Sequence, residues 1–369
     1  MAGGHVLVNG AAGFLGSAVV RELREAGYDV RATDRPGTDL TPAAALGAEV
    51  VHQDLLDAAG VRALMEGVDT AANVVGLFDF TLPYEALYDA NVRCTENMAR
   101  AALDAGLQRF VHVASIAVYG LPVDYRVREE SLQRPRNGYE RTKKLGEDLV
   151  WHLQREAGLP ATSIRPALIY GPGSRYGQAL FIGLLALMTA RDFPHAYFYD
   201  GGPEMHHVQV EDAARAIRLL LERDAGVVGK AFNCADDTPV NWGRWLQWIA
   251  QELDLDYGII PWYDWLAAIL FPALVNIPRW PIARLNDWLG PIWEEVVQHH
   301  GLTGQLTPRL ERAFFPYLAG HHVYDTSRLA SLGFTPRHPD TEAGVRDTVR
   351  WYIDQRWLPG PPACTTKES

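Results

Sequence analysis

Residues 10–16, with the sequence GAAGFLG, decide the fold that this chain predicts. They follow a short apolar segment, 5–9, and they open a helix-length segment, 17–26, which ends at Gly27. Glycines at such a strand-to-helix turn allow a tight bend and a close approach of the backbone to a pyrophosphate, whose charge then lies at the helix N-terminus. Their spacing differs from the usual G-x-G-x-x-G, so the prediction depends on the sequence around them.

The same alternation of short apolar runs and helix-length segments continues through the N-terminal half of the chain. Nearly continuous apolar strands that alternate with helices indicate a parallel sheet with both faces covered. We therefore expect an α/β fold with a Rossmann-type doubly wound parallel sheet and a smaller, mostly helical C-terminal substrate domain. Further expected strands are 29–34, 49–54, 70–75, 110–114 and 161–165, and further expected helices are 84–105 and 139–157.

After residue 173 this pattern loosens, and proline, tryptophan and phenylalanine become dense between residues 261 and 316. Two later pieces, 208–221 and 230–233, regain the strand and helix pattern, so we expect a discontinuous domain boundary. We assign 1–173 and 206–235 to an NAD-binding Rossmann domain, and 174–205 and 236–358 to a substrate-binding domain with a Trp-rich insertion at 255–320. The polar, proline-containing tail 359–369 is expected to be disordered.

Asp34 supports a dinucleotide as the ligand of the glycine turn. It ends the second expected strand, eighteen residues after Gly16, where a carboxylate can accept hydrogen bonds from the adenosine ribose. A carboxylate at this place repels a 2′-phosphate, which favours NAD over NADP. NADP stays the less favoured alternative, because Arg31 or Arg35 could turn toward such a phosphate.

Tyr139 and Lys143 stand at i and i+4, which places a phenol and an ammonium on one helix face. A tyrosine of pKa about 10 is a poor base at neutral pH, but a cation beside it favours the phenolate and makes proton exchange with an alcohol feasible. Ser115 ends a strand of the same α/β unit, and ligands bind at such strand ends. We expect its hydroxyl to hydrogen-bond the same substrate oxygen as the tyrosine.

This ordered set of motifs resembles the extended short-chain dehydrogenase/reductase family, within the NAD-dependent epimerase/dehydratase superfamily. The likeness runs from Val6 to about Gly173 and resumes at 208–212 and 324–336, so it frames nearly the whole chain. The motifs that carry it are Gly10-x-x-Gly13-x-x-Gly16, Asp34, Asp54-Leu55, Asn91-Val92, Ser115 with Val118-Tyr119-Gly120, Tyr139-x-x-x-Lys143, Arg165-Pro166 and Tyr170-Gly171-Pro172-Gly173.

The resemblance implies a role for each matching residue. It implies that Tyr139 is the acid/base, that Lys143 lowers the pKa of Tyr139 and holds the nicotinamide ribose, and that Ser115 donates to the substrate oxygen. The implied substrate contacts are Ser115, Ile116, Tyr139 and Tyr170. The implied NAD site comprises Gly10, Ala12, Gly13, Phe14, Leu15, Gly16, Asp34, Arg35, Asp54, Leu55, Asn73, Val74, Asn91, Ala114, Tyr139, Lys143 and Pro166, with Asp54 and Leu55 beside the adenine.

Departures from the family pattern bear on the reaction. Asn73, Cys94 and Ala114 replace a frequent His, Gly and Ser, and none of these changes removes a catalytic group. Sugar-nucleotide dehydratases of this family carry Asp-Glu after the catalytic Ser or Thr, where this chain has Ile116 and Ala117, so dehydration is disfavoured. A sugar-nucleotide epimerase that retains NAD stays an alternative. A non-catalytic dinucleotide sensor is disfavoured, because the tyrosine and lysine are both present.

Tryptophans point to an apolar substrate. The chain has 11 of them, and those between residues 242 and 293 are Trp242, Trp245, Trp248, Trp262, Trp265, Trp280, Trp288 and Trp293. This insertion is similar in position to that of the 3β-hydroxysteroid dehydrogenase-like branch, which implies a hydrophobic, sterol-like alcohol or ketone as substrate. The alternatives are a core of the second domain, a dimer interface, or a peripheral membrane contact through 262–293, where interfacial Trp is favoured.

Composition excludes several other classes. The net charge of −11 argues against a nucleic-acid partner, which needs a basic face. The three cysteines are too few for a disulfide framework, no histidine pair has acidic or cysteine partners at ligand spacing, and so we expect no metal. We see no signal peptide and no spanning segment. We expect a cytoplasmic homodimer, with membrane-surface association left open.

Overall fold

The computed structural model describes residues 4–191, 193 and 195–360, and the expected tail lies outside the described residues from 361 on. The chain forms two compact units. The first unit comprises Met1–Ile169, Val208–Ala235 and Tyr324–Arg337, and the second comprises Tyr170–His207, Asp236–Val323 and His338–Ser369. This division differs from the expected one at 170–173 and 206–207, which we expect in the Rossmann domain, and at 324–337, which we expect in the substrate domain. Residues 324–337 belong to the first unit because α13 (Ser327–Ala330) packs on β12 (Ala231–Cys234).

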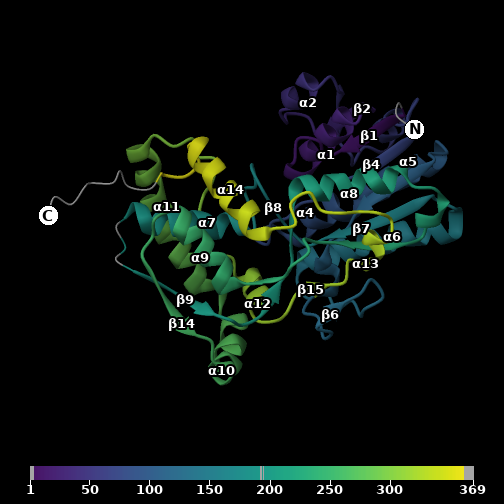
Figure 1. The fold of residues 1–369 in the computed structure, drawn as a ribbon. Helices are drawn as coiled ribbons and strands as arrows, with labels where there is room; N and C mark the ends of the chain where they lie inside the picture. Colours follow the sequence, from purple (N-terminus) through teal and green to yellow (C-terminus); the bar gives the residue numbers. More distant parts are fainter. Residues whose placement is uncertain (1–3, 192, 194, 361–369) are drawn as a thin grey trace. The chain divides into compact units, whose positions relative to one another are not determined.

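A seven-stranded parallel sheet organises the first unit, and the expected α/β fold is confirmed (Figure 1). The strand order is β12-β7-β5-β4-β1-β2-β3, so the order reverses between β1 and β4. Ligands of doubly wound sheets bind at such a reversal, beyond the carboxyl ends of the strands. The strands are β1 (His5–Asn9), β2 (Asp29–Asp34), β3 (Glu49–His52), β4 (Thr70–Asn73), β5 (Arg109–Val113), β7 (Ala161–Pro166) and β12.

Two groups of helices pack on the sheet. Leu7 and Phe110 of the strands share a buried core with Val61, Met98 and Val150 from α3, α5 and α6. Helices α1 and α8 pack on each other, and α8 contacts β4, β5 and β7. The helical and short elements of this unit are α1 (Phe14–Glu25), α2 (Thr41–Ala45), α3 (Ala58–Ala63), α4 (Tyr84–Tyr88), η1 (Asp89–Arg93), α5 (Cys94–Asp104), η2 (Ile116–Tyr119), β6 (Arg126–Val127), α6 (Gly138–Ala157), α8 (Val210–Glu222), η3 (Ala225–Val227) and α13.

The expected helix at 84–105 is interrupted by one π turn, η1. A Cβ at Gly146 of α6 would lie 2.4 Å from the carbonyl oxygen of Asn91 in this turn, so glycine permits the close packing of the two helices. Single π turns inside α-helices often mark functional sites.

Asn233 of β12 ties together the three chain segments of the first unit. Its Nδ2 donates to the carbonyl oxygens of Val127 (3.2 Å) and Asp325 (3.3 Å), and its Oδ1 accepts from the hydroxyl of Tyr119 (2.8 Å). Because these residues come from all three segments, the unit is completed by its most C-terminal piece.

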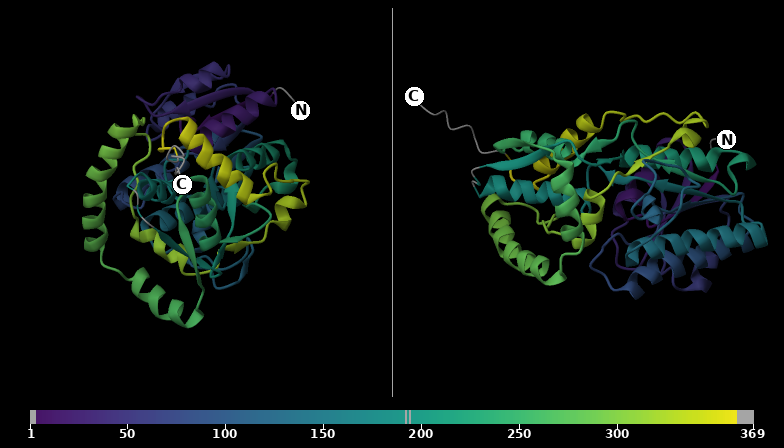
Figure 2. Two further views of the ribbon diagram at one scale, coloured as in Figure 1. Left: turned by 60° about the vertical axis from the view of Figure 1, so that its left-hand side comes forward. Right: turned by 90° about the horizontal axis from the view of Figure 1, so that it is seen from below.

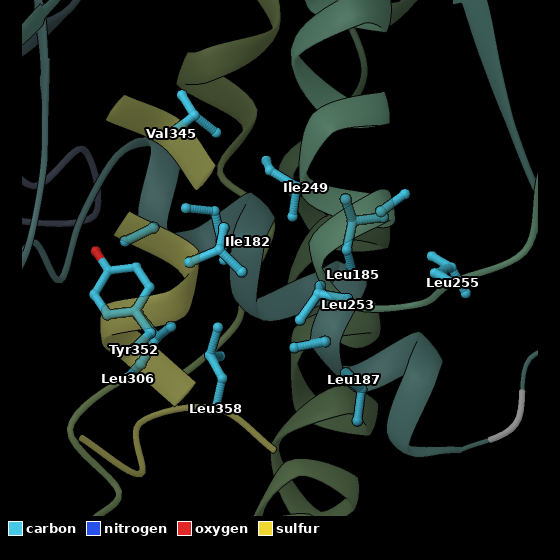
Figure 3. Close-up of a cluster of buried hydrophobic side chains, with 14 of the residues drawn as sticks. Ile182, Leu185, Leu187, Ile249, Leu253, Leu255, Leu306, Val345, Tyr352 and Leu358 are labelled. Carbon is cyan, nitrogen blue, oxygen red and sulfur yellow. The ribbon is translucent and has the colours of Figure 1, made fainter. Parts of the chain in front are cut away.

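The second unit is mostly helical and has its own core (Figure 3). Ile182 and Leu185 of α7 pack with Ile249 of α9 and with Val345 and Tyr352 of α14. The elements from residue 168 on that lie outside the first unit, or at its junctions with the second, are β8 (Leu168–Tyr170), α7 (Gln178–Ala190), β9 (Ala196–Asp200), β10 (Glu204–Met205), β11 (His207–Gln209), β13 (Val240–Asn241), α9 (Trp242–Glu252), β14 (Tyr257–Pro261), α10 (Asp264–Val275), α11 (Arg279–His300), η4 (Arg312–Phe314), α12 (Phe315–Leu318), β15 (Val323–Tyr324) and α14 (Thr341–Asp354).

Six of the eight tryptophans between residues 242 and 293 divide into a buried and an exposed group, and the other two, Trp242 and Trp262, are half-buried. Trp245, Trp248 and Trp293 are buried in the core of the second unit, as the alternative of a structural core predicts. Trp265, Trp280 and Trp288 are exposed on α10 and α11. Among the described residues, none of the helices combines the length and the apolar character needed to cross a bilayer.

Candidate active site

The glycine turn forms a cradle for an anionic group at the start of α1. Gly10 has a φ of +64°, and the amide of Gly13 donates to its carbonyl oxygen (2.9 Å). A Cβ at Gly16 would lie 2.0 Å from that same oxygen, so only glycine lets the helix approach the turn this closely. Phe14 and Leu15 open the helix, whose first turn holds no acidic side chain. The turn therefore fits a pyrophosphate at the positive end of the helix dipole.

Asp34 is bound to the same turn. Its Oδ2 accepts from the amide of Ala12 (3.0 Å), and its Oδ1 accepts from the amide of Arg35 (2.8 Å). The guanidinium of Arg31 donates instead to the Glu49 carboxylate and to the carbonyl oxygens of Leu64 and Glu66. Arg31 is thus engaged away from the turn, and Arg35, which is exposed, is the remaining cation next to Asp34. These residues fit NAD better than NADP, because the carboxylate of Asp34 rather than a cation faces the glycine turn.

Asp54 and Leu55 follow β3, the edge strand of the sheet, which β1 and β2 separate from β4. The Oδ1 of Asp54 accepts from the amide of Leu56 (2.9 Å), while Leu55 is buried and its carbonyl oxygen accepts from Asn97 (2.8 Å). The loop after β3 is therefore held against α5. It lies at the carboxyl edge of the sheet, where the adenine end of a dinucleotide is expected.

Asn9, at the end of β1, binds the end of β4 at the point where the strand order of the sheet reverses. The sequence alone did not indicate it as a site residue. Its Oδ1 accepts from the amides of Val74 (2.7 Å) and Val75 (2.8 Å), and its Nδ2 donates to Asn73 (2.6 Å). These bonds end β4 at Asn73, where a strand to residue 75 had been expected. The Nδ2 of Asn73 in turn contacts the Nδ1 of His112 (3.0 Å). Asn73 is thus part of a buried polar network beneath the carboxyl ends of β1, β4 and β5.

Asn91 of the π turn supports the loop that follows Val75. Its Oδ1 accepts from the amide of Leu77 (2.9 Å), and its Nδ2 donates to the hydroxyl of Thr142 on α6 (3.0 Å). A Cβ at Gly76 would lie 3.0 Å from the Oδ1 of Asn91 and 3.4 Å from the Nζ of Lys143. The loop backbone therefore runs directly over the lysine.

Ser115, Tyr139 and Lys143 come together at the carboxyl end of β5. Ser115 follows this strand, and its Oγ accepts from the amide of Ala117 (3.1 Å) and hydrogen-bonds the phenol of Tyr139. A capping box of Asn137 and Glu140 fixes the first turn of α6, which carries Tyr139. Lys143 lies one turn later, and its Nζ donates to the carbonyl oxygen of Val113 (2.6 Å). This geometry suits proton exchange between the phenol and an oxygen held beside Ser115.

Burial dominates the electrostatics of these groups. It raises the pKa of Tyr139 to about 12, although the hydrogen bond from Ser115 acts in the opposite direction. It lowers the pKa of Lys143 to about 8, against the charge of Glu147, which raises it. The net effect is thus opposite to the lowering of the tyrosine pKa that the resemblance implies for Lys143, because removing the phenolate from water has the largest effect and the charge of Glu140 adds to it.

An apolar cover surrounds the tyrosine. The rings of Phe78 and Phe80 meet the ring of Tyr139 edge to face, with centroids 5.0 and 5.7 Å away, and they contact each other at 5.2 Å. Leu77, Leu82 and Leu87 pack against the same cluster. We call residues 77–82 the aromatic loop. Sequence reasoning missed it, although the alternation of apolar residues in LFDFTL was a visible signal.

The remaining implied site residues lie on the same unit, with one exception. Ala114 donates its amide to Ile164 (2.9 Å), Ile116 begins η2 and is buried, and Pro166 ends β7. Tyr170 belongs to the second unit, where its ring contacts His207 (6.3 Å). Within the described ranges, no group of three or more His, Cys, Asp or Glu side chains is arranged to hold a metal ion.

Comparison with known proteins gives concordant matches. Residues 6–235 match the profile described as the NAD dependent epimerase/dehydratase family. Sterol demethylase protein B of Methylococcus capsulatus is 31% identical over 95% of this chain and 98% of its own length. A 3-beta-hydroxysteroid dehydrogenase of Mycolicibacterium neoaurum is 34% identical over 47% of this chain and 49% of its own. The fold is similar to UDP-glucose 4-epimerase of Thermotoga maritima, with a TM-score of 0.70 at 18% identity over 95% of this chain and 99% of that one.

Proposed function

Because the chain belongs to the NAD-dependent epimerase/dehydratase family, we propose that it is an oxidoreductase that acts on a secondary alcohol or ketone of a hydrophobic, sterol-like molecule. The observation that carries this proposal is the cover of Phe78 and Phe80 over Tyr139. A hydroxyl that reaches the tyrosine has to pass apolar rings, which favours a molecule whose carbon skeleton is itself apolar.

The catalytic groups have separate tasks in this proposal. In ketone reduction, Tyr139 gives its phenolic proton to the carbonyl oxygen while the Ser115 hydroxyl donates a hydrogen bond to the same oxygen. In alcohol oxidation the phenolate of Tyr139 accepts the hydroxyl proton of the alcohol. Lys143, whose ammonium lies under the loop at Gly76, holds positive charge near the tyrosine and would bind the ribose beside the nicotinamide. NAD, when bound, supplies or accepts the hydride.

The cofactor end is formed by residues that fit NAD. The turn of Gly10, Gly13 and Gly16 would hold the pyrophosphate, and Asp34 would accept from the adenosine ribose. The substrate class is supported by two relatives whose names refer to sterols or steroids, and one of them aligns with nearly the full chain.

A substrate panel tests the proposal. The purified chain is incubated with NAD or NADP and with sterols, other hydrophobic secondary alcohols and sugar nucleotides, and reduced cofactor is followed by absorbance. We expect turnover of the apolar alcohols with NAD, and a loss of about 10²- to 10⁴-fold in kcat for Tyr139→Phe. Turnover that survives Tyr139→Phe within a few fold contradicts the proposed role. Retained UDP-sugar, seen by native mass spectrometry with no turnover of apolar alcohols, identifies an NAD-retaining epimerase instead.

A further inference from the structure

Four polar residues form a row across the buried sheet of the first unit. Asn9 of β1 pairs in register with Asn73 of β4, and Asn73 pairs with His112 of β5. Ser163 of β7 pairs with His112 on its other side. We call these four residues the polar row, and each of them is 1% exposed or less. Strands buried in parallel sheets are normally apolar, because a buried polar group costs free energy unless it is hydrogen-bonded, so the row points to a task other than packing.

The polar row faces α5 and α6. Side chains two residues apart on a strand share a face, and Phe110, two residues before His112, packs in the core that the sheet shares with these helices. The right-hand view of Figure 2 shows α5 and α6 side by side on this unit. Lys143 of α6 reaches the same region, because its Nζ donates to the carbonyl oxygen of Val113, the residue after His112 (2.6 Å). The row therefore lies next to the lysine of the candidate active site.

The donors and acceptors of the row have only one consistent arrangement. Backbone amides can only donate, so the Oδ1 of Asn9, which accepts from the amides of Val74 (2.7 Å) and Val75 (2.8 Å), is the oxygen of that side chain. Its Nδ2 then donates to the Oδ1 of Asn73 (2.6 Å), and the Nδ2 of Asn73 has to donate to the Nδ1 of His112 (3.0 Å). The Nδ1 of His112 is therefore an acceptor that carries no proton.

This arrangement keeps the His112 ring neutral. An imidazole with a bare Nδ1 carries its proton on Nε2. A second proton would direct an N–H of His112 against the N–H of Asn73 and would add a charge near the ammonium of Lys143. Burial and, to a smaller extent, the charge of Lys143 lower the pKa of His112 well below its usual value. Glu147, the carboxylate of α6 in this region, accepts instead from the hydroxyl of Ser163 at the end of the row (2.6 Å).

The other end of this chain of hydrogen bonds fixes the backbone that covers Lys143. Asn9 binds the two amides that follow β4, and a Cβ on the next residue, Gly76, would lie 3.4 Å from the Nζ of Lys143. The carbonyl oxygen of Val113 on β5 accepts from the same Nζ. The lysine thus contacts two backbone segments, and the polar row joins these segments to each other.

We propose that His112 is a positioning residue for Lys143, because its unprotonated Nδ1 completes the chain of hydrogen bonds that holds the loop at Gly76 against the lysine. The inference rests on the proposed function, in which Lys143 binds the ribose beside the nicotinamide and holds positive charge near Tyr139. His112 is buried in the sheet and acts through Asn73 rather than on a substrate.

Imidazole NMR of the parent protein tests the first step and needs no activity. With ¹⁵N-labelled histidine, two-bond ¹H–¹⁵N spectra distinguish the two neutral tautomers from the imidazolium, and the His112 signal is the one that His112→Asn removes. We expect the Nε2–H tautomer, unchanged between pH 6 and pH 8. The Nδ1–H tautomer, or an imidazolium in this range, overturns the proposal.

Two amide substitutions test which ring nitrogen matters. The Oδ1 of an asparagine can take the place of the Nδ1 of His112, whereas the Oε1 of a glutamine reaches the place of the Nε2. We expect His112→Asn to bind NAD and turn over the alcohol nearly as the parent does. His112→Gln should raise the Kd of NAD and lower kcat/KM by about 10- to 100-fold, since a small misplacement of a binding group is costly. His152→Gln, which replaces an exposed histidine of α6, is the matched control and should behave like the parent.

A third variant addresses the chain of donors directly. The carboxylate of Asn73→Asp cannot donate to the Nδ1 of His112, so the ring should take up a proton there and give the signal of an imidazolium near neutral pH. Thermal unfolding shows which variants are folded under the assay conditions. An unchanged His112 signal in Asn73→Asp, or equal losses in His112→Asn and His112→Gln, contradicts the positioning role. Failure of the proposed function gives a different result, because the parent then turns over no alcohol while the tautomer of His112 stays measurable.

Discussion

Glu147 serves two cations in the interior of the first unit. Its carboxylate accepts from the Nε and Nη2 of Arg165 (both 2.9 Å) and from the hydroxyl of Ser163 (2.6 Å). One helical turn earlier on α6, Lys143 keeps more of its charge because Glu147 raises the lysine pKa against the effect of burial. One carboxylate thus stabilises both a structural arginine and the lysine of the candidate active site.

Removing the charge of Glu147 should therefore be costly. We expect Glu147→Gln to lower the free energy of unfolding by about 3–5 kcal/mol, because Arg165 would remain buried without a counter-charge. Urea denaturation measures this. Asp148→Asn, which breaks the more exposed pair with Lys144 on the same helix, should change the free energy by less than about 1 kcal/mol. Similar losses in the two variants would contradict the buried-pair interpretation.

The pH dependence of turnover should report on Tyr139. Alcohol oxidation needs the phenolate, so its rate should rise with pH toward the raised pKa of Tyr139, whereas ketone reduction needs the phenol and should stay level through neutral pH. Ser115→Ala removes the hydrogen bond that lowers this pKa, so the alkaline limb of oxidation should move to higher pH. Profiles of kcat/KM against pH for parent and variant check the shift. An alkaline limb at the same pH in both proteins would show that Ser115 does not affect the pKa of Tyr139.

At the scale of elements, the aromatic loop covers Tyr139, and under the proposed function it would also determine which alcohols reach it. Asp79 accepts from the amide (2.8 Å) and the hydroxyl (2.6 Å) of Thr81, which closes a turn that directs Phe78 and Phe80 to one side. We expect Phe78→Ala with Phe80→Ala to lower kcat/KM for bulky apolar alcohols about tenfold or more, and to affect small alcohols less. Tyr125→Ala, which truncates an exposed ring of the same unit, is the control.

The same double variant has a second expected effect. Exposing Tyr139 to water reduces the burial that raises its pKa, so the alkaline limb of oxidation should move to lower pH, opposite to the shift expected for Ser115→Ala. An unchanged limb together with unchanged selectivity would show that the loop is only a surface feature.

The packing of α6 on the π turn predicts that replacing glycine by alanine has opposite effects on stability at two helical positions. Gly146→Ala should destabilise the chain by about 1–3 kcal/mol, because the new Cβ meets the carbonyl oxygen of Asn91. Gly290→Ala in α11 should instead stabilise it by up to about 1 kcal/mol, since nothing lies within 4 Å of that position and alanine favours helix. Thermal unfolding of both variants measures the contrast, and equal signs would refute the close approach.

For the whole molecule, sequence patterns predicted the features that depend on residues close together in the chain. Apolar runs alternating with helices predicted the parallel sheet, and the i, i+4 spacing placed Tyr139 and Lys143 on one turn of α6. The π turn could not be predicted, because it depends on how Asn91 meets Gly146, fifty-five residues away. Nor could the raised pKa of Tyr139, since it depends on how deeply the folded chain buries the phenol, which the ring contacts with Phe78 and Phe80 accompany. Composition likewise does not distinguish the buried Trp293 from the exposed Trp288.

Part of the acid sensitivity of the whole chain should arise in the second unit, in addition to the part from the buried His112 of the first unit, whose pKa burial also lowers. His207 is buried, its ring stacks on Trp245 and contacts Trp242, and burial, with a smaller contribution from the neighbouring His206, lowers its pKa to about 3. Below pH about 6.5 the unfolded chain takes up a proton that the folded chain does not, so stability should fall by up to about 1.4 kcal/mol per pH unit. Urea midpoints between pH 7 and pH 4 check this.

The control for that experiment keeps the ring and removes the titration. His207→Phe preserves an aromatic ring against Trp245, so its stability should depend less on pH than that of the parent. Equal slopes for the two proteins would assign the acid sensitivity to other groups.

The bonds of Asn233 to Val127 and Asp325 have a consequence for how the protein is made in the cell. Domains fold as units while the ribosome adds about 5–20 residues each second. The first unit cannot close when its main segment ends at Ile169, since α13 is synthesised only after the whole insertion has emerged. Nascent chains therefore carry an open edge at β12 for many seconds. A chaperone that shields this edge during translation would increase the yield of native protein more than one that acts after release.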